Sequence, residues 1–172
     1  MSTTIDRPGP RTGDAHLTGE SVWRALAKAS FAVVSYVTPT GRPRSSGVVY
    51  TTVGRRLFVV TAVDSWKARH IAASGQVAVT VPVRRGGIMS LLLPIPPATI
   101  SFHAAAVVHP GGSVEESLPK AFVSLLPAER RTSGCVIEIL PVGQCLTYGL
   151  GVSLMRLRSP ALARARVPVT EG

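Results

Sequence analysis

A run of hydroxyl-bearing and cationic residues, Ser65-Trp66-Lys67-Ala68-Arg69, follows an apolar stretch that ends near Thr61. The stretch is typical of a strand, and the residues after it are typical of a helix that Asp64 or Ser65 can cap. A helix N-terminus disfavours a cation by a few tenths of a kcal/mol up to about 1 kcal/mol. Lys67 becomes favourable there if an anion lies between its ammonium group and the backbone N–H groups. The spacing therefore indicates a phosphate site, and the alternative is a solvated lysine on a surface helix.

The other reactive residues form no recognisable catalytic set. The sequence contains no GxSxG, GxGxxG, Walker A, HExxH or CxxC motif, and its nine carboxylates suggest no acid–base pair. The four histidines show no metal-ligand spacing, so we expect no metal site. Cys135 and Cys145 are expected to be buried thiols. An enzyme with so few reactive groups would rely on a cofactor for its chemistry.

The elements expected to position the Ser65–Arg69 run are mostly strands. β-type patterns predict strands at 31–37, 45–52, 57–62, 76–83 and 99–108, and a last hairpin of 135–140 with 144–150. Turns with glycine make the first three strands a meander of two antiparallel hairpins. Helices are expected at 21–29, from about 65, at 113–126 and from 159. This pattern predicts a mainly β protein, a small antiparallel β-barrel with a few helices.

Length and composition predict one domain with a well-buried core. Residues 1–16 are polar and rich in Pro, Gly and Thr, and we expect a disordered N-terminal tail followed by a single barrel domain at 17–172. No apolar run is long enough to span a bilayer and no secretory h-region precedes the domain, so a cytoplasmic location is expected. The irregular segment 84–97 would suit a dimer contact or a lid over a ligand.

The net charge of +10 favours anionic partners, although many proteins carry basic residues for solubility alone. A basic β-barrel that binds nucleic acid is one possible class. Such proteins interleave cations with surface aromatic residues, and aromatics make up only 5% of this chain. We therefore expect no nucleic-acid partner, and no membrane partner.

The order of these features resembles one known family. A strand with Arg44-Ser45-Ser46-Gly47-Val48-Val49-Tyr50, a glycine turn, a strand ending at Thr61 and the run Ser65–Arg69 together resemble the pyridoxamine 5'-phosphate oxidase-like split-barrel flavoproteins. The deazaflavin oxidoreductases of actinobacteria are among their relatives. The resemblance is good over 31–83 and looser beyond. It implies a six-stranded antiparallel split β-barrel and a homodimer with cofactor sites at the subunit interface.

Carried over position by position, the resemblance implies a site for FMN or the deazaflavin coenzyme F-420. Lys67 would bind the phosphate and Ser65 would add a hydroxyl, with weaker help from Arg69. Many oxidases of the family have arginine where this chain has Trp66, so one cation is lost and a possible stacking partner for the ring is gained. The remaining residues would line the ring or the ribityl chain, namely Ser45, Ser46, Val48, Val49, Tyr50, Val60 and Thr61.

The function expected from this resemblance is a flavin- or deazaflavin-dependent oxidoreductase that transfers a hydride between the ring and a small organic substrate. The alternative is a non-catalytic protein that holds a flavin or a haem on the same barrel. For Trp66 and Tyr50 the alternative is ordinary packing, and for Arg84 and Arg85 it is a solvated turn rather than contact with a phosphate. His70 is a weak candidate for a catalytic acid. No catalytic residue can be named from the sequence.

Overall fold

The computed structural model describes residues 17–84, 96–109, 118–124, 126–152, 159 and 163–169. The expected tail at 1–16, most of the irregular segment 84–97 and residues 113–117 of an expected helix lie outside these ranges. The elements in chain order are α1 (Gly19–Lys28), β1 (Phe31–Val37), β2 (Pro43–Val49), β3 (Thr51–Val53), β4 (Arg56–Ala62), α2 (Trp66–Ser74), β5 (Gln76–Val83), β6 (Ala98–His109), α5 (Lys120–Val123), α6 (Ala128–Ser133), β7 (Gly134–Tyr148) and β8 (Arg164–Pro168).

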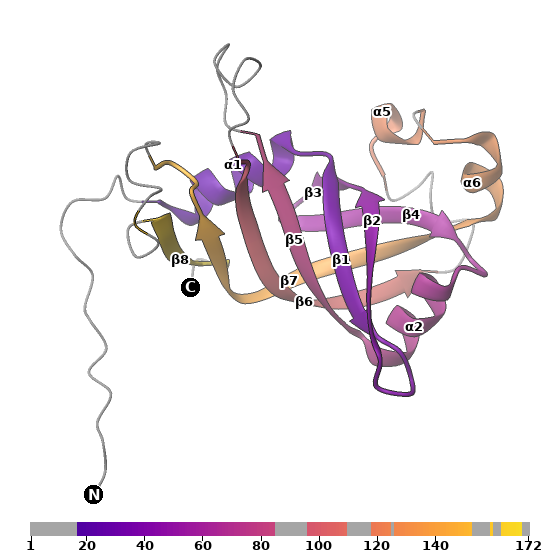
Figure 1. Cartoon of the computed structure of the whole chain (residues 1–172). Helices are drawn as coiled ribbons and strands as arrows, with labels where there is room; N and C mark the ends of the chain where they lie inside the picture. Colours follow the sequence, from indigo (N-terminus) through magenta and orange to yellow (C-terminus); the bar gives the residue numbers. More distant parts are fainter. Residues whose placement is uncertain are drawn as a thin grey trace, which may run out of the picture.

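The strands form one curled antiparallel sheet (Figure 1). Its order is β2-β1-β5-β6-β7-β4-β3, and β8 pairs with β7 outside this path. The two ends of the path, β2 and β3, are separated by a single residue, Tyr50, so they are two pieces of one bent strand. The sheet therefore curls so far that the strands at its two ends, β2 and β3, are consecutive in the sequence. The predicted fold class, a mainly β split barrel with few helices, is confirmed.

Both hairpins of the predicted meander are confirmed, but the strand that they share is not continuous. β1 with β2 and β3 with β4 are antiparallel hairpins as expected, and β4 pairs on its other side with β7. The cause of the break is the bend at Tyr50, whose buried side chain turns the predicted 45–52 strand into two. This bend adds one strand and β8 adds another, whereas the two strands predicted at 135–140 and 144–150 form one. The sheet therefore has eight strands, where the sequence patterns predicted seven and the resemblance implied six.

The predicted hairpin at 135–150 is wrong, because β7 runs through without a turn. Gly143 has a φ of 73°, and the pairing register with β6 shifts between Ser101 and His103. Pro141-Val142-Gly143 therefore forms an irregularity within a continuous strand, because β6 on one side and β8 on the other supply pairing partners. Residues 160–162 of the short helix expected from Ser159 lie outside the described ranges. The backbone N–H of Ala163 donates to the carbonyl of Ser159 at 3.2 Å, the i to i−4 bond of a helical turn, and the additional strand β8 follows at Arg164–Pro168.

The core lies inside the curl of the sheet and is closed at one end by α1. Thr18 caps this helix, and its apolar face buries Val22, Trp23 and Leu26. Two long-range hydrogen bonds hold α1 in place. The Trp23 indole Nε1 donates to the carbonyl oxygen of Val169 at 3.2 Å, and the Tyr50 hydroxyl donates to that of Leu26 at 2.7 Å.

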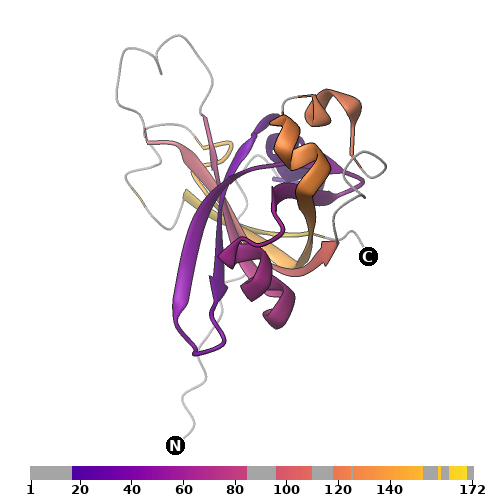
Figure 2. The ribbon, with the colours of Figure 1, turned by 90° about the vertical axis from the view of Figure 1, so that its right-hand side faces the viewer.

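The second helix of the barrel, α2, lies at the other end of the sheet (Figure 1). In Figure 1, α2, α5 and α6 all lie to the right of α1, and Figure 2 looks onto that end of the sheet, with these three helices in front. α5 covers the outer face of β4, where Leu118 and Phe122 pack on Phe58, Val60 and Val136 as a second small core. The end of β4 is thus held between two packed layers before the chain enters α2.

Candidate functional site

The junction between β4 and α2 is where the sequence predicts a phosphate site. Ser65 is the N-cap of α2, as one of the two expected caps, and its side-chain oxygen accepts from the backbone N–H of Ala68 at 3.3 Å. The Thr61 hydroxyl donates to the same oxygen at 3.4 Å. α2 ends at Gly75, a left-handed C-cap with a φ of 64°. The hydroxyl of Ser65 is therefore held in place from the strand and from the helix.

The residues of this junction fit an anion such as a phosphate group. Both hydrogen bonds of Ser65 use its oxygen as the acceptor, so the hydroxyl hydrogen is the part that an anion would meet. α2 directs its first backbone N–H groups to the same place. Lys67, half-buried on the first turn, adds a positive charge, and this charge acts on the thiol of Cys135 across the sheet. A cation, a hydroxyl and a helix N-terminus converge here.

Cys135 is the strand partner of Thr61 and is fully buried. Burial raises the pKa of its thiol, and the hydrogen bond to its backbone and the charge of Lys67 lower that pKa by less. Burial also raises the pKa of Cys145 to about 11. Both cysteines are separate thiols, as predicted. At neutral pH they remain protonated, so neither supplies a thiolate for chemistry at the junction.

A cluster of aromatic side chains lies on the next face of α2. The Trp66 ring is 69% exposed, the guanidinium of Arg69 lies 4.3 Å from its centroid, and the His70 ring lies 5.6 Å from it. The ring of Tyr36 lies 5.8 Å from that of His70, and its hydroxyl shares a hydrogen bond with that of Ser46 at 3.3 Å. The rings of His70 and Tyr36 thereby link Trp66 on α2 to Ser46 on β2. Trp66 itself is exposed and packs little into the core.

Three residues that were predicted to contact the ring have side chains packed in the two hydrophobic cores. Val48 and Tyr50 are buried in the main core, and the Tyr50 hydroxyl is engaged by Leu26, so burial raises its pKa. Val60 points to the opposite face of β4 from Thr61, into the cluster with Phe122. Alternation along a strand places neighbouring side chains on opposite faces, so Val60 and Thr61 do not face one ligand together. Ring contacts by these three residues stay predictions that their placement does not support.

The outer face of the sheet carries the remaining two predicted residues, Ser45 and Val49. Ser45 shares a hydrogen bond with Ser35 at 2.8 Å, and Val49 is 60% exposed. Strand pairing continues this face from Gly47 through β1, β5 and β6 to Leu146 on β7. It combines small residues with exposed large apolar side chains, namely Val37, Val49, Val142 and Leu146. We call this surface the outer sheet face.

Sequence reasoning missed two residues that complete the site. Tyr36 joins α2 to β2, and Cys135 lies opposite Thr61. The alternation of β1 could have placed Tyr36 on the inner face. Nothing local to Cys135 predicts that β7 pairs with β4, because that pairing spans more than seventy residues of chain.

Among the described residues, no group of three His, Cys, Asp or Glu side chains is arranged to hold a metal ion. In the same part of the chain, no helix combines the length and the apolar character that crossing a membrane requires.

Comparisons with solved structures return many similar folds. A putative pyridoxamine 5'-phosphate oxidase from Listeria innocua aligns with a TM-score of 0.55 at 16% identity, over 72% of this chain and 92% of that one. An F420 reductase aligns with a TM-score of 0.53 at 18% identity, over 69% and 91%. The haem storage protein HutZ from Vibrio cholerae aligns with a TM-score of 0.57 at 15% identity, over 76% and 94%.

No protein-family model and no curated protein matches the sequence. The similarity to solved structures shows that the chain has the fold of the pyridoxamine 5'-phosphate oxidase-like split-barrel proteins. Similar structures also include a protein named FMN-binding and one named FAD-binding. The resemblance predicted from the Arg44–Tyr50 and Ser65–Arg69 motifs is confirmed at the level of the fold.

Proposed function

We propose that this protein is an oxidoreductase that binds FMN or the deazaflavin coenzyme F-420 and acts on a small organic substrate. The observation that carries the proposal is the β4–α2 junction, where Ser65 and Lys67 meet the N-terminus of α2 beside Thr61. Both cofactors present a phosphate and a flat tricyclic ring to a protein. The fold of an F420 reductase and of FMN-binding proteins supports the proposal.

The residues divide the binding of such a cofactor between them. Lys67, the Ser65 hydroxyl and the α2 N-terminus hold the phosphate. Trp66, on the exposed side of α2, offers an aromatic face near the phosphate end, and Arg69 covers its other face. The bound ring supplies the hydride chemistry itself, so the protein needs no acid–base pair of its own. This agrees with the scarcity of carboxylates in the sequence.

The proposal includes a homodimer with a cofactor site at the subunit interface. Exposed apolar side chains gather on the outer sheet face, as they do on surfaces that bind another protein. Ser45 and Val49 lie on this face, so a second copy covering it would enclose them next to a bound ring. This is how residues that point away from the barrel within one chain would still contact the cofactor.

Replacement of Lys67 by alanine tests the proposed phosphate contact. Loss of a charge-assisted hydrogen bond should weaken cofactor binding by about tenfold or more. The measurement is the quenching of ring fluorescence as wild type and Lys67→Ala are titrated with FMN and, separately, with coenzyme F-420. Lys120→Ala removes an exposed lysine on α5 and is the matched control. Equal affinities in wild type and Lys67→Ala would contradict the assignment of Lys67.

A non-catalytic protein that holds a flavin or a haem is the second candidate. It is favoured by His70, whose ring lies 5.6 Å from that of Trp66 and whose Nδ1 atom is buried without a hydrogen-bond partner. The split-barrel fold of a haem storage protein supports it too. Turnover of any donor and acceptor pair by the cofactor-loaded protein would exclude storage alone. Tight haem binding with no flavin binding would favour storage over the proposed oxidoreductase.

A further inference from the structure

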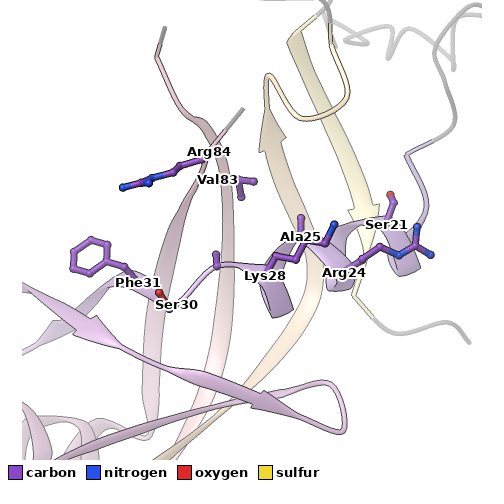
Figure 3. A pocket seen from close by; sticks show the side chains of 9 residues that line it. Ser21, Arg24, Ala25, Lys28, Ser30, Phe31, Val83 and Arg84 are labelled. Carbon is purple, nitrogen blue, oxygen red and sulfur yellow. The ribbon is translucent and has the colours of Figure 1, made fainter. Parts of the chain in front are cut away.

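A groove lies beside α1, at the end of the sheet opposite to α2. Its volume is about 610 Å³, within the range of small-molecule sites. One wall is α1 with the residues that follow it, and the other is the start of β1 and the end of β5 (Figure 3). Four of its lining residues are charged or aromatic, namely Arg24, Lys28, Phe31 and Arg84.

Three cations and no carboxylate line this groove. Arg24 and Lys28 are one turn apart on α1, whereas Arg84 comes from the end of β5 and is brought to the same groove by the fold. Arg24 bonds to Glu20 at 2.9 Å, but both side chains are well exposed, and such pairs contribute little. The negative end of the α1 dipole accounts for one cation, Lys28, in the last turn. It does not account for Arg84, which lines the same groove from the end of β5 and whose side chain extends away from α1 in Figure 3. Like charges around one groove are relieved by a bound anion.

An aromatic side chain gives the groove an apolar surface as well. Phe31 is 46% exposed, and its ring lies over Gly47 of the neighbouring strand, where an added Cβ would meet ring carbons at 3.0 Å. Glycine at this position therefore allows the ring to lie flat against β2. Figure 3 shows Phe31 and the side chain of Arg84 on the same side of the groove, with Lys28 and Arg24 along α1. A ligand in this groove would meet both positive charge and a flat apolar face.

The groove is distinct from the β4–α2 junction. It lies at Phe31, the first residue of β1, whereas α2 contacts β1 through Tyr36, near the last. At about 3.3 Å per strand residue, the two places are roughly 17 Å apart along β1. A phosphate held by Lys67 therefore does not reach Arg84 of the same chain.

We propose that this groove is a second binding site, for an organic anion that carries phosphate or carboxylate charge next to a flat apolar body. Arg84 and Lys28 bind the charged group from the two walls, Arg24 adds to the positive field, and Phe31 packs against the apolar part. The groove lies at the other end of β1 from the phosphate site proposed at Lys67, and the proposal does not depend on which cofactor binds there.

Calorimetric titration of the full-length protein with 2-naphthyl phosphate tests the site. At mildly alkaline pH this probe carries nearly two negative charges, because the second pKa of a phosphate monoester is about 6. Wild type should bind it, and the double variant Lys28→Gln with Arg84→Gln should bind about tenfold or more weakly. The control is Lys120→Gln with Arg131→Gln, which removes the same charge from α5 and α6 and should bind as wild type does.

Two further titrations sharpen the result. Phe31→Leu keeps an apolar side chain over Gly47 but removes the ring. It should reduce the affinity for 2-naphthyl phosphate more than the affinity for inorganic phosphate. Because 2-naphthyl phosphate also fits the phosphate site proposed at Lys67, the titrations are repeated in the Lys67→Ala background. There binding to the groove should persist, and Lys28→Gln with Arg84→Gln should still weaken it by about tenfold or more. The proposal is overturned by absence of binding at millimolar probe, by equal affinity for neutral 2-naphthol, by equal weakening in the two double variants, or by loss of binding in Lys67→Ala.

Discussion

Tyr50 holds the bend between β2 and β3 against the segment that leads from α1 into β1. Its backbone N–H donates to the carbonyl of Ser30 at 3.0 Å, and its hydroxyl donates to that of Leu26 at 2.7 Å. Both acceptors belong to the segment that leads from α1 into β1. The bend between β2 and β3 is therefore tied to the helix that closes the core.

Tyr50→Phe should destabilise the fold by about 1–3 kcal/mol, because it leaves the buried carbonyl of Leu26 without its donor. Denaturant unfolding followed by circular dichroism measures this change. Tyr148→Phe, at a half-buried tyrosine on β7, is the matched control and should cost less. Stability equal to that of wild type would show that the hydrogen bond contributes nothing measurable.

Glu138 is the second residue whose environment has a measurable consequence. It is nearly buried, and its two oxygens meet Arg56 on β4 and His109 on β6 at 2.5 Å and 2.7 Å. Burial alone would raise the pKa of this carboxyl, but the hydrogen bonds and charges of His109 and Arg56 outweigh burial and lower it. The carboxylate therefore joins three strands in its ionised form.

Since the folded state holds the pKa of Glu138 below the ordinary value of 4.5, its ionised form stabilises the fold above that pH. This stabilisation is lost as the pH falls through the lowered pKa. Glu138→Gln should therefore flatten the loss of stability on acidification below the ordinary pKa, measured as urea midpoints over a pH series. Glu20→Gln, at an exposed carboxylate, is the control and should keep the wild-type slope. Parallel curves for wild type and Glu138→Gln would contradict the role of this carboxylate.

At the scale of elements, α2 is short and depends on its two ends. Ser65 begins it, and Gly75 ends it in the left-handed region, with its backbone N–H donating to the carbonyl of Ile71 at 2.8 Å. Only Ala68 and Ile71 of this helix are buried. The position of Lys67 therefore depends on the caps more than on apolar packing.

Gly75→Ala should destabilise the protein by about 1–2 kcal/mol through the cost of a left-handed backbone for a residue with a Cβ. An added Cβ meets nothing within 4 Å, so the loss would be conformational rather than steric. Thermal unfolding measures it. Gly75→Asn is the informative comparison, because asparagine tolerates this conformation and should recover part of the loss. An equal loss in both variants would show that the left-handed conformation is not the cause.

At the scale of the whole molecule, the outer sheet face leaves apolar side chains exposed on strands far apart in sequence. Leu146 on β7 is 44% exposed, and strand pairing places it in a row with Ser101, Thr80, Val33 and Gly47. The face is continuous because β2, β1, β5, β6 and β7 pair side by side without a break. A second copy of the chain would bury it in the proposed homodimer.

Leu146→Lys should weaken the proposed dimer by about tenfold or more, because it places a charge in an apolar interface, twice per dimer. Analytical ultracentrifugation over a concentration series measures the effect. Val53→Lys adds the same charge at an exposed valine of the β3–β4 hairpin and should leave association unchanged. A wild-type monomer at all concentrations, or a dimer unaffected by Leu146→Lys, would contradict an interface on this face.

Local sequence determined most of the elements of this protein. Alternating valines predicted β5, and a β-type run predicted the first strand. Ser65, one of the two expected caps, begins the helix that was expected from about residue 65. These features depend on neighbours within a few residues, so propensity and capping chemistry are enough to predict them. The phosphate-site hypothesis for Lys67 rested on the same local grounds.

Only the tertiary structure decided how these elements join. Pro141 and Gly143 predict a turn locally, but β6 and β8 pair along both sides of β7 and keep it a single strand. Tyr50 and Val60 belong by sequence to the strands of the expected site, yet one is turned into the core and the other toward α5. The reason is physical: a strand has two faces of similar composition, and which one is buried depends on partners that lie far away in the chain.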